Sequence, residues 1–281
     1  METIVVFGLG LIGGSMALAL KNENRMLIGV DNNETNANKA LELGIVNRLG
    51  TLQDVANADV VIVAVPVNFA PELTLKVLDL INPKTLVFDV GSVKSAICKA
   101  VKNHPKRINF VAAHPIAGTE YSGPEAAFKQ LFINKKNIIC ESNKSGNIFL
   151  KKALNLFDAL QMTTTFMEAK AHDRHIAYVS HLSHISSFML GKTVLEIEKD
   201  EKSIFTMAGS GFASTVRLSK SSPSTWTPIF IQNKDNILKS LEEYIKNLNQ
   251  FKELLKQEAE ADLYKSMKST HHLKNILSEI K

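Results

Sequence analysis

Short apolar runs rich in β-branched residues alternate with amphipathic segments between Thr3 and Phe166, and this alternation limits the possible folds more than any other feature of the sequence. Such runs are typical of parallel strands covered by helices on both faces, so the pattern predicts a doubly wound α/β sheet. Segments Asn33–Leu43 and Phe69–Leu80 have the helical period and are expected to supply covering helices. The expected strands are Thr3–Phe7, Met26–Val30, Val60–Val65, Thr85–Asp89, Asn109–Ala113, Asn137–Cys140 and Thr163–Phe166.

Long helical periodicities replace the strand signals after about residue 168. They cover Ala171–Val194, Lys234–Lys256 and the charged segment Glu258–Ile280. Ser219–Pro228, which contains two prolines and many hydroxyl side chains, is expected to be a loop beside a site. We therefore predict two domains, a Rossmann-type dinucleotide-binding domain at residues 1–168 and an all-helical domain at residues 169–281.

Composition and charge describe an ordinary globular protein with a packed core. Hydrophobic residues make up 45% of the 281 residues and charged residues 22%. The net charge of +5 comes mainly from lysine, and the few arginines are scattered instead of clustered with aromatic residues. This distribution argues against a nucleic-acid partner, whereas the positive charge suits small anionic substrates.

The sequence carries no sign of export or of a membrane. We find no signal-peptide pattern at its start and no apolar run near the ~18 residues that a transmembrane helix needs. Cys98 and Cys140 show neither metal-ligand spacing nor a disulfide pattern. We therefore expect a cytoplasmic protein.

A glycine-rich segment follows the first expected strand and opens an apolar helix, which is the context of a dinucleotide-binding loop. Gly8 would permit the tight turn, Gly10 would let the backbone approach a pyrophosphate, and Gly13 would let helix and strand pack closely. The residues between these glycines, which would also line the cofactor, are Leu9, Leu11 and Ile12. The alternative is a glycine turn with a purely structural role.

Asp31 ends the second expected strand, about 20 residues after the glycines, where such folds bind the ribose of the cofactor. Its carboxylate would accept hydrogen bonds from the ribose hydroxyls and repel the extra phosphate of NADP. We therefore predict NAD as the cofactor. Val65 and Pro66, where the third expected strand ends, would line the cofactor crevice.

Two polar segments follow neighbouring strands, and both are expected to border the nicotinamide because reacting groups in open α/β sheets lie at the carboxyl ends of strands. His114 is the first candidate for the base that takes a hydroxyl proton during dehydrogenation. Ser92 could share or orient the same hydroxyl, and Glu120 could hold the loop or tune the histidine. A packed or solvated histidine is the alternative.

The helical part carries a second polar cluster. His181 and His184 share a helix face and are either a substrate-facing pair or hydrogen-bonded core residues; two histidines alone do not predict a metal site. Arg217 lies among apolar and hydroxyl residues, where it could grip a planar anion or pair with a glutamate. Trp226 is interpreted as a core anchor or a lid residue.

Together these segments resemble the prephenate and arogenate dehydrogenases of tyrosine biosynthesis. Ser183 stands where the family motif has proline, a change that removes no functional group. The motifs that carry the resemblance, in the order of the family, are Gly8–Ser15, Asp89–Lys94, His114–Glu120, Ser180–His184 and Arg217–Trp226.

The resemblance implies NAD-dependent oxidative decarboxylation of prephenate to 4-hydroxyphenylpyruvate, with conversion of arogenate to tyrosine as the alternative. By position, His114 would accept the proton of the ring hydroxyl with help from Ser92, and Arg217 would bind a substrate carboxylate. The residues implied to shape the pocket are Ser180, His181, His184 and Glu120.

The resemblance also implies a homodimer formed through the helical domain, in which Trp226 could reach the other subunit's site. It leaves inhibition by tyrosine open. Two remoter alternatives are a β-hydroxyacid dehydrogenase, which would use a lysine on a helix as its acid or base, and a non-catalytic NAD sensor.

Overall fold

The computed structural model describes residues 1–278 and separates into two compact units, which meet between Asn233 and Lys234 in the sequence. The first unit begins at Met1 and contains the sheet, and the second begins at Lys234. The end of the predicted helical segment Glu258–Ile280 lies outside the described residues.

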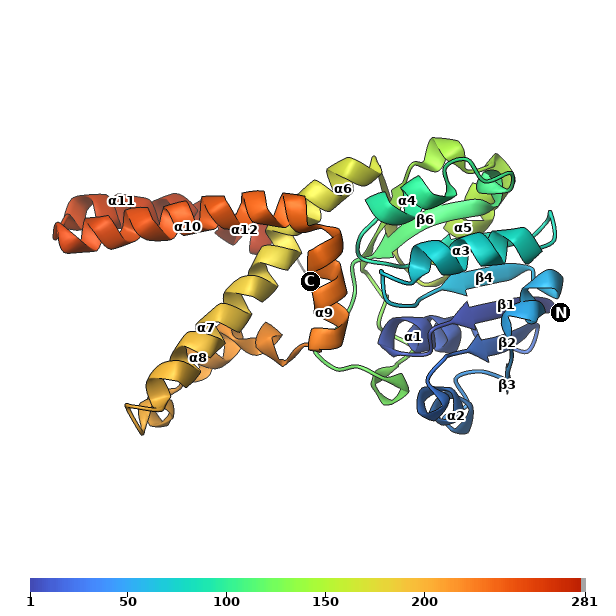
Figure 1. Ribbon diagram of the computed structural model, residues 1–281, viewed down its shortest axis with the longest axis horizontal. Coiled ribbons are helices and arrows are strands. Elements are labelled where there is room, and N and C mark those ends of the chain that lie inside the picture. Colours follow the sequence, from blue (N-terminus) through green and yellow to red (C-terminus); the bar gives the residue numbers. More distant parts are fainter. Residues whose placement is uncertain (279–281) are drawn as a thin grey trace. The chain divides into compact units, whose positions relative to one another are not determined.

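The first unit is built on one mixed sheet with the strand order β3-β2-β1-β4-β5-β6-β7-β8 (Figure 1). On one side of β1 the strands follow in the order β2 and β3, and on its other side they run from β4 to β8. A topological switch point therefore lies between β1 and β4. The strands are β1 (Glu2–Phe7), β2 (Arg25–Val30), β3 (Arg48–Leu49), β4 (Val60–Val63), β5 (Leu86–Asp89), β6 (Phe110–Pro115), β7 (Lys136–Cys140) and β8 (Thr163–Met167).

The predicted fold class and all the predicted strands are confirmed, with two differences. The short strand β3 was not predicted, because two residues are too few to give a periodic signal. The apolar runs predicted parallel strands, and this prediction is wrong for β7, which runs antiparallel to β6. The chain between β6 and β7 contains only a short 3-10 turn, at Pro124–Ala126, instead of the helix that usually carries a parallel crossover.

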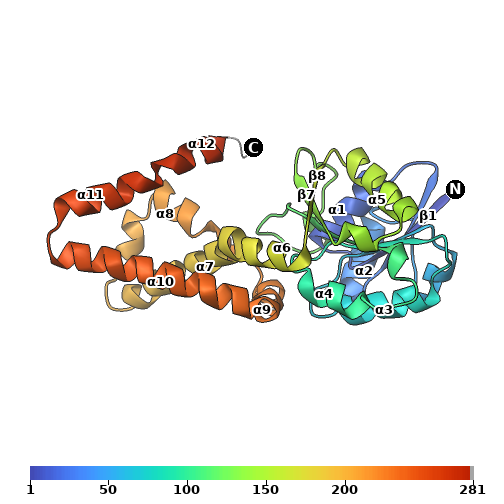
Figure 2. The ribbon, with the colours of Figure 1, turned by 90° about the horizontal axis from the view of Figure 1, so that it is seen from above.

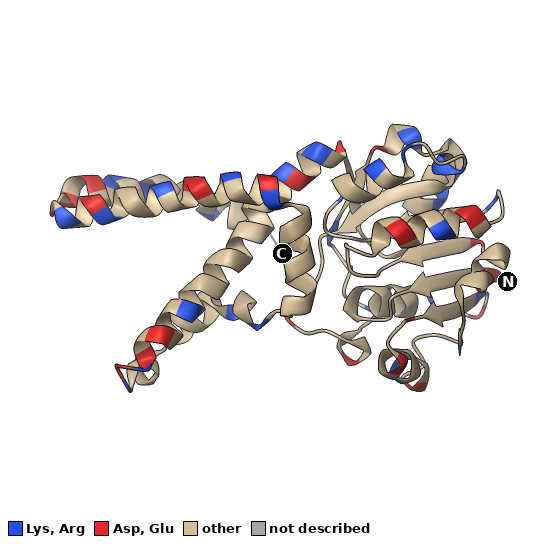
Figure 3. Cartoon of the chain, in the orientation of Figure 1, with Lys and Arg blue, Asp and Glu red and all other residues tan. Residues whose placement is uncertain are grey.

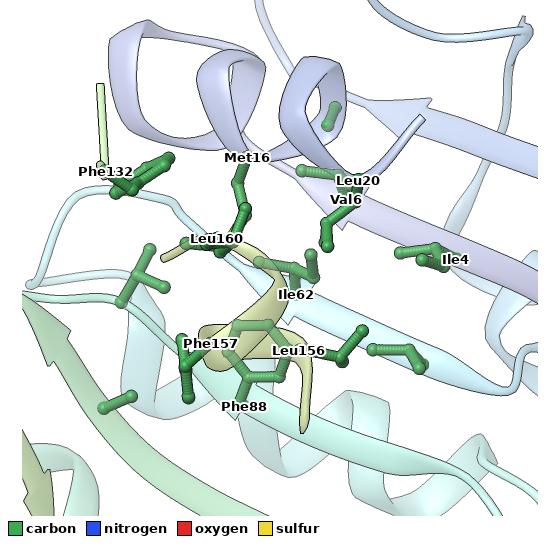
Figure 4. Packing of buried hydrophobic residues seen from close by; sticks show 14 of the residues in the cluster. Ile4, Val6, Met16, Leu20, Ile62, Phe88, Phe132, Leu156, Phe157 and Leu160 are labelled. Atoms are coloured by element: carbon green, nitrogen blue, oxygen red, sulfur yellow. The ribbon is translucent and has the colours of Figure 1, made fainter. Parts of the chain in front are cut away.

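Two hydrophobic cores lie on opposite faces of the sheet. Successive residues of β1 alternate between them: Ile4 and Val6 belong to one cluster and Val5 and Phe7 to the other. The first cluster is covered by α1 (Leu11–Leu20) and α5 (Asn147–Ala159), whose Phe157 packs edge-on against Phe88 with ring centroids 5.3 Å apart (Figure 4). Helices α3 (Ala70–Leu80) and α4 (Ser95–Val101) cover the second cluster, while α2 (Glu34–Glu42) packs beside β2 and β3.

The first unit continues through helices that carry further polar residues. The predicted helix Ala171–Val194 is present, but it is divided by a π-helical turn, which single-period reasoning could not anticipate. The loop expected at Ser219–Pro228 is wrong in its second half, because α9 begins at Pro223, where a missing N–H costs no hydrogen bond. The segments are α6 (Ala169–Ile176), the π-helical turn Ala177–His181, α7 (Leu182–Glu198), α8 (Ser210–Thr215) and α9 (Pro223–Gln232).

The second unit is helical. Helix α10 (Lys234–Lys256) has the predicted bounds and is followed by α11 (Glu260–Ser269) and α12 (Leu273–Ser278). Helices α10 and α11 lie side by side (Figure 2), and charges of both signs run along them (Figure 3). Several large apolar side chains of this unit are nevertheless exposed: Leu248, Leu255, Tyr264, Met267 and Leu273. Within residues 1–278, no helix has the length and apolar character needed to cross a membrane.

Candidate active site

The three glycines of the loop after β1 differ in their surroundings. Gly8 has a φ of +85°, and a Cβ atom there would overlap the carbonyl of Ala64. A Cβ on Gly13 would overlap the carbonyl oxygen of Gly8 and lie 2.9 Å from the Cβ of Ala64. A Cβ on Gly10, in contrast, would meet nothing within 4 Å. Gly8 and Gly13 are therefore required by the fold, whereas Gly10 leaves space beside the loop for another molecule.

The beginning of α1 and the end of β2 meet in this loop. Gly10 is the N-cap of α1, and as a glycine it has no side chain that could cap the first amides of the helix. Such amides form an anion-binding site. One oxygen of Asp31 accepts a hydrogen bond from the Leu9 amide at 2.8 Å, and the other accepts one from the Asn33 amide at 2.9 Å. The carboxylate is thus held beside the glycine loop, where a ribose would lie.

The loop after β5 carries Ser92, and a hydrogen bond from Lys94 connects this loop to β6. Lys94 is fully buried; its ammonium group contacts the carboxylate of Asp89 and donates a hydrogen bond to the carbonyl of Ala113 at 2.6 Å. This carbonyl directly precedes His114. Lys94 was not predicted as a site residue, because a lysine inside a polar motif has no signal that distinguishes it from a solvated one.

His114 lies near the end of β6 and is 8% exposed. Its Nδ1 atom lies 2.8 Å from Nε2 of His172, and Nδ1 of His172 lies 2.8 Å from Oδ1 of Asp173. Both partners come from α6 and are buried. His172 and Asp173 were not predicted as site residues, because nothing in the local sequence indicates that α6 meets the end of β6.

His181 and His184 both pack against Trp226, which α9 presents. The ring of His184 stacks on Trp226 at 3.4 Å between centroids, and His181 meets the same ring edge-on at 5.9 Å. Trp226 packs in turn against Val67 and Val93, in the loops after β4 and β5. The predicted histidine pair and tryptophan therefore lie together at the carboxyl edge of the sheet.

Burial disfavours the charged forms of three histidines of this site, His114, His181 and His184. Burial, with help from the neighbouring charges, lowers the pKa of His114 well below its usual value. Burial lowers the pKa of His181 to about 4, although Asp173 opposes the shift. Burial also lowers the pKa of His184, with a smaller contribution from Arg217. Neutral imidazoles can accept a proton at neutral pH, as a general base must.

The low pKa of His181 predicts that the protein loses stability in acid. Between pH 6.5 and about 4 the unfolded chain binds a proton on this residue that the folded chain does not, so acidification favours unfolding. Each pH unit within that window should cost about 1.4 kcal/mol for this group. Urea denaturation of the wild type and His181→Asn at pH 7 and pH 5 measures the effect. From pH 7 to pH 5, the free energy of unfolding should fall by about 2 kcal/mol less in the variant than in the wild type. An equal fall in both proteins would show that His181 is not the origin of the acid sensitivity.

Arg217 is half exposed, and its guanidinium lies 3.5 Å from the carboxylate of Glu120. This distance is at the outer limit of a hydrogen bond, and the exposed setting makes the pair weak. The guanidinium therefore keeps donors for another anion, while the glutamate pairing foreseen as the alternative is also present. Among residues 1–278, no cluster of histidine, cysteine, aspartate and glutamate suits a metal ion.

A Rossmann-type sheet with this glycine loop, and with a buried histidine at its carboxyl edge, defines a nucleotide-dependent dehydrogenase. Residues 16–164 match the family model of the prephenate dehydrogenase nucleotide-binding domain, and residues 168–269 match that of the prephenate dehydrogenase dimerization domain. The chain belongs to the prephenate dehydrogenase family, which confirms the resemblance seen in the sequence.

Individual relatives agree with this assignment. The prephenate dehydrogenase of Bacillus subtilis (strain 168) is 32% identical over 278 residues, which cover 95% of this chain and 74% of the relative. A crystal structure of prephenate dehydrogenase from A. aeolicus, in complex with hydroxyphenyl propionate and NAD+, is 32% identical and has a TM-score of 0.89; the match covers 100% of this chain and 99% of that one. Synechocystis arogenate dehydrogenase is 26% identical with a TM-score of 0.78, over 98% of this chain and 100% of that one.

Proposed function

We propose that this chain catalyses the NAD-dependent oxidative decarboxylation of prephenate to 4-hydroxyphenylpyruvate, a step in tyrosine biosynthesis. The observation that carries the proposal is the position of His114, a buried imidazole held by His172 at the carboxyl edge of the dinucleotide-binding sheet. Family membership supplies the substrate class. The NAD+ named for the A. aeolicus structure supports the choice of cofactor.

The glycine loop fits the cofactor. The free space at Gly10 and the uncapped amides at the start of α1 suit a pyrophosphate, and Asp31 suits the ribose hydroxyls. The side chains of Leu9 and Leu11 are buried in the core, so these residues would face the cofactor through their backbone. Ile12, and Val65 and Pro66 after β4, would complete this side of the crevice. When bound, NAD accepts the hydride.

His114 would accept the proton of the ring hydroxyl as the hydride leaves, and Ser92 would orient the same hydroxyl. The proton returns to that oxygen when the ring becomes aromatic and carbon dioxide is released. Because aromatisation drives the reaction forward, the protein needs mainly to position the base, the ring and the cofactor. Arg217 would bind the substrate carboxylate that is retained, and the pocket would be shaped by Ser180, His181, His184, Glu120 and Trp226.

Absorbance of NADH at saturating substrate tests the proposal. The assay compares prephenate, arogenate and a simple β-hydroxyacid, each with NAD and with NADP. Turnover of prephenate with NAD is expected. Faster turnover of arogenate would instead identify an arogenate dehydrogenase, a reading that the likeness to the Synechocystis enzyme favours. Turnover of the hydroxyacid alone, or NAD binding without any turnover, would refute the proposal.

Arg217→Ala is expected to raise the KM for prephenate about ten- to a hundredfold and to change kcat much less, because the guanidinium would bind the substrate in the ground state and in the transition state. Arg174→Ala, which removes an exposed arginine from α6, is the matched control. Steady-state kinetics of both variants measure the effect. An unchanged KM in Arg217→Ala would show that the contact with Glu120 is the main role of this residue.

We also propose a homodimer that forms through residues 169–281, with residues 1–168 as the dinucleotide-binding domain. The match to a dimerization domain and the exposed apolar side chains of the second unit support the dimer. In the dimer, Trp226 could reach the other subunit's site.

Tyrosine shares its hydroxyphenyl ring with the product and is proposed as a competitive inhibitor. The two buried, unpaired cysteines suit a reducing compartment such as the cytoplasm.

A further inference from the structure

The side chains of His114, His172 and Asp173 form a continuous buried chain from the end of β6 into α6. Two contacts of 2.8 Å link the three residues, and their exposed fractions are 8%, 3% and 2%. Three ionisable side chains are rarely buried together without a functional reason, because each loses hydration. Proton acceptance by one nitrogen of His114 does not explain why His172 and Asp173 are buried behind it.

Asp173 is the fixed negative end of this chain. Besides the contact with His172, its two oxygens accept hydrogen bonds from the backbone amides of Lys94 and Ser95, each at 2.8 Å. Burial alone would raise the pKa of Asp173, but the hydrogen bonds from His172, Ser95 and Lys94 outweigh burial and lower it. The group is therefore an anion that can only accept hydrogen bonds.

This anion determines where the protons of both histidines lie. His172 must carry its proton on Nδ1, because Nδ1 faces the carboxylate. The two nitrogens that face each other, Nε2 of His172 and Nδ1 of His114, share one proton. With Nδ1–H on His172, the tautomer that leaves its Nε2 as a lone pair accepts a hydrogen bond from Nδ1–H of His114. As a result, Nε2 of His114 is left with a free lone pair. We propose that Asp173, acting through His172, holds His114 in the tautomer whose Nε2 atom is the base for the substrate hydroxyl.

The hydrogen-bonded side chains of His114, His172 and Asp173 also stabilise the positive charge that the reaction creates. When Nε2 of His114 takes the proton, its Nδ1 proton can pass to Nε2 of His172, so that one N–H bond breaks and another forms. The positive charge then lies on His172, in direct contact with Asp173. Lys94, which is paired with Asp89, also acts on His114 electrostatically. Its ammonium group disfavours a cation on His114, so the transfer toward Asp173 offsets this effect.

Asp173 additionally connects the two loops that carry the proposed chemistry. Its hydrogen bonds to Lys94 and Ser95 hold the end of the loop that contains Ser92, while His172 holds the ring of His114. A single carboxylate thus positions both groups that would act on the substrate hydroxyl. His172 and Asp173 are positioning residues in this scheme, and the scheme rests on the proposed dehydrogenase function.

We call the path from Asp173 through His172 to His114 the relay. Substitutions on α6 test it. Asp173→Asn should lower kcat by about 10³-fold, because an amide no longer fixes the tautomer. His172→Asn should lower kcat by about 10- to 100-fold: its amide still donates to Asp173, but it lacks the Nε2 acceptor for His114. This second variant keeps the bonds from Lys94 and Ser95 to Asp173, so it should fold even if Asp173→Asn does not. His175→Asn, the same substitution at an exposed position of α6, should behave as the wild type.

The tautomer itself is measurable without turnover. In the ¹⁵N NMR spectrum of the protein with NAD, His114 should carry its proton on Nδ1, and in His172→Asn it should shift toward the Nε2 form. This measurement separates failure of the relay from failure of the proposed function, since it needs no substrate. A wild-type proton on Nε2, or wild-type kcat in both His172→Asn and Asp173→Asn, would overturn the relay.

Discussion

Replacing His114 with asparagine is expected to lower kcat for prephenate by about two to four orders of magnitude and to leave the Kd for NAD nearly unchanged. The asparagine amide can occupy the position of Nδ1 and still donate to His172, so the buried chain on α6 keeps its partner. The variant lacks only the nitrogen proposed to accept the proton. Steady-state kinetics and a fluorescence titration with NAD measure the two quantities.

His175→Asn serves as the control, because this histidine is exposed on α6. Thermal melting of both variants establishes that they fold. If His114→Asn turned over prephenate at close to the wild-type rate, another group would have to be the base, and the catalytic role of His114 would be abandoned.

Gly13→Ala is expected to destabilise the protein by about 3 kcal/mol or more, because the added methyl group would overlap the Gly8 carbonyl and press on Ala64. The backbone of the loop after β1 cannot yield without separating α1 from the strand on which it packs. Urea denaturation without cofactor measures the loss.

Gly10→Ala is the matched comparison in the same loop. Its methyl group would meet no protein atom within 4 Å, so stability should change by less than about 0.5 kcal/mol. The same methyl group would occupy the space proposed for the pyrophosphate, and the Kd for NAD should rise at least about tenfold, which is about 1.4 kcal/mol. Unchanged NAD affinity in folded Gly10→Ala would show that the cofactor does not approach this glycine.

The predicted secondary structure was most accurate where the signal is local. The apolar runs of β1, β2, β4 and β5 and the periodicity of α10 gave element positions close to those observed. The predicted secondary structure was less accurate where one sequence feature is compatible with two structures. Pro223 suggested a loop, yet a proline in the first turn of a helix is equally compatible with α9.

The candidate site was predictable in part for the same reason. Gly8, Gly13 and Asp31 are constrained by a loop whose geometry depends on neighbouring residues, so their pattern is visible in the sequence. Lys94 and Asp173 had no such pattern. Their partners lie elsewhere in the chain, and a buried charge is recognisable only once those partners are known.

Strand period and turn chemistry are properties of adjacent residues, so the Rossmann-type sheet of the first part of the chain, its glycine loop and the acidic residue at the end of β2 could be read from the amino-acid sequence. The antiparallel direction of β7 and the meeting of His172 and Asp173 on α6 with His114 became visible in the folded chain alone. His114 and His172 are 58 positions apart. No local period specifies such a contact, which arises from packing α6 at the carboxyl edge of the sheet.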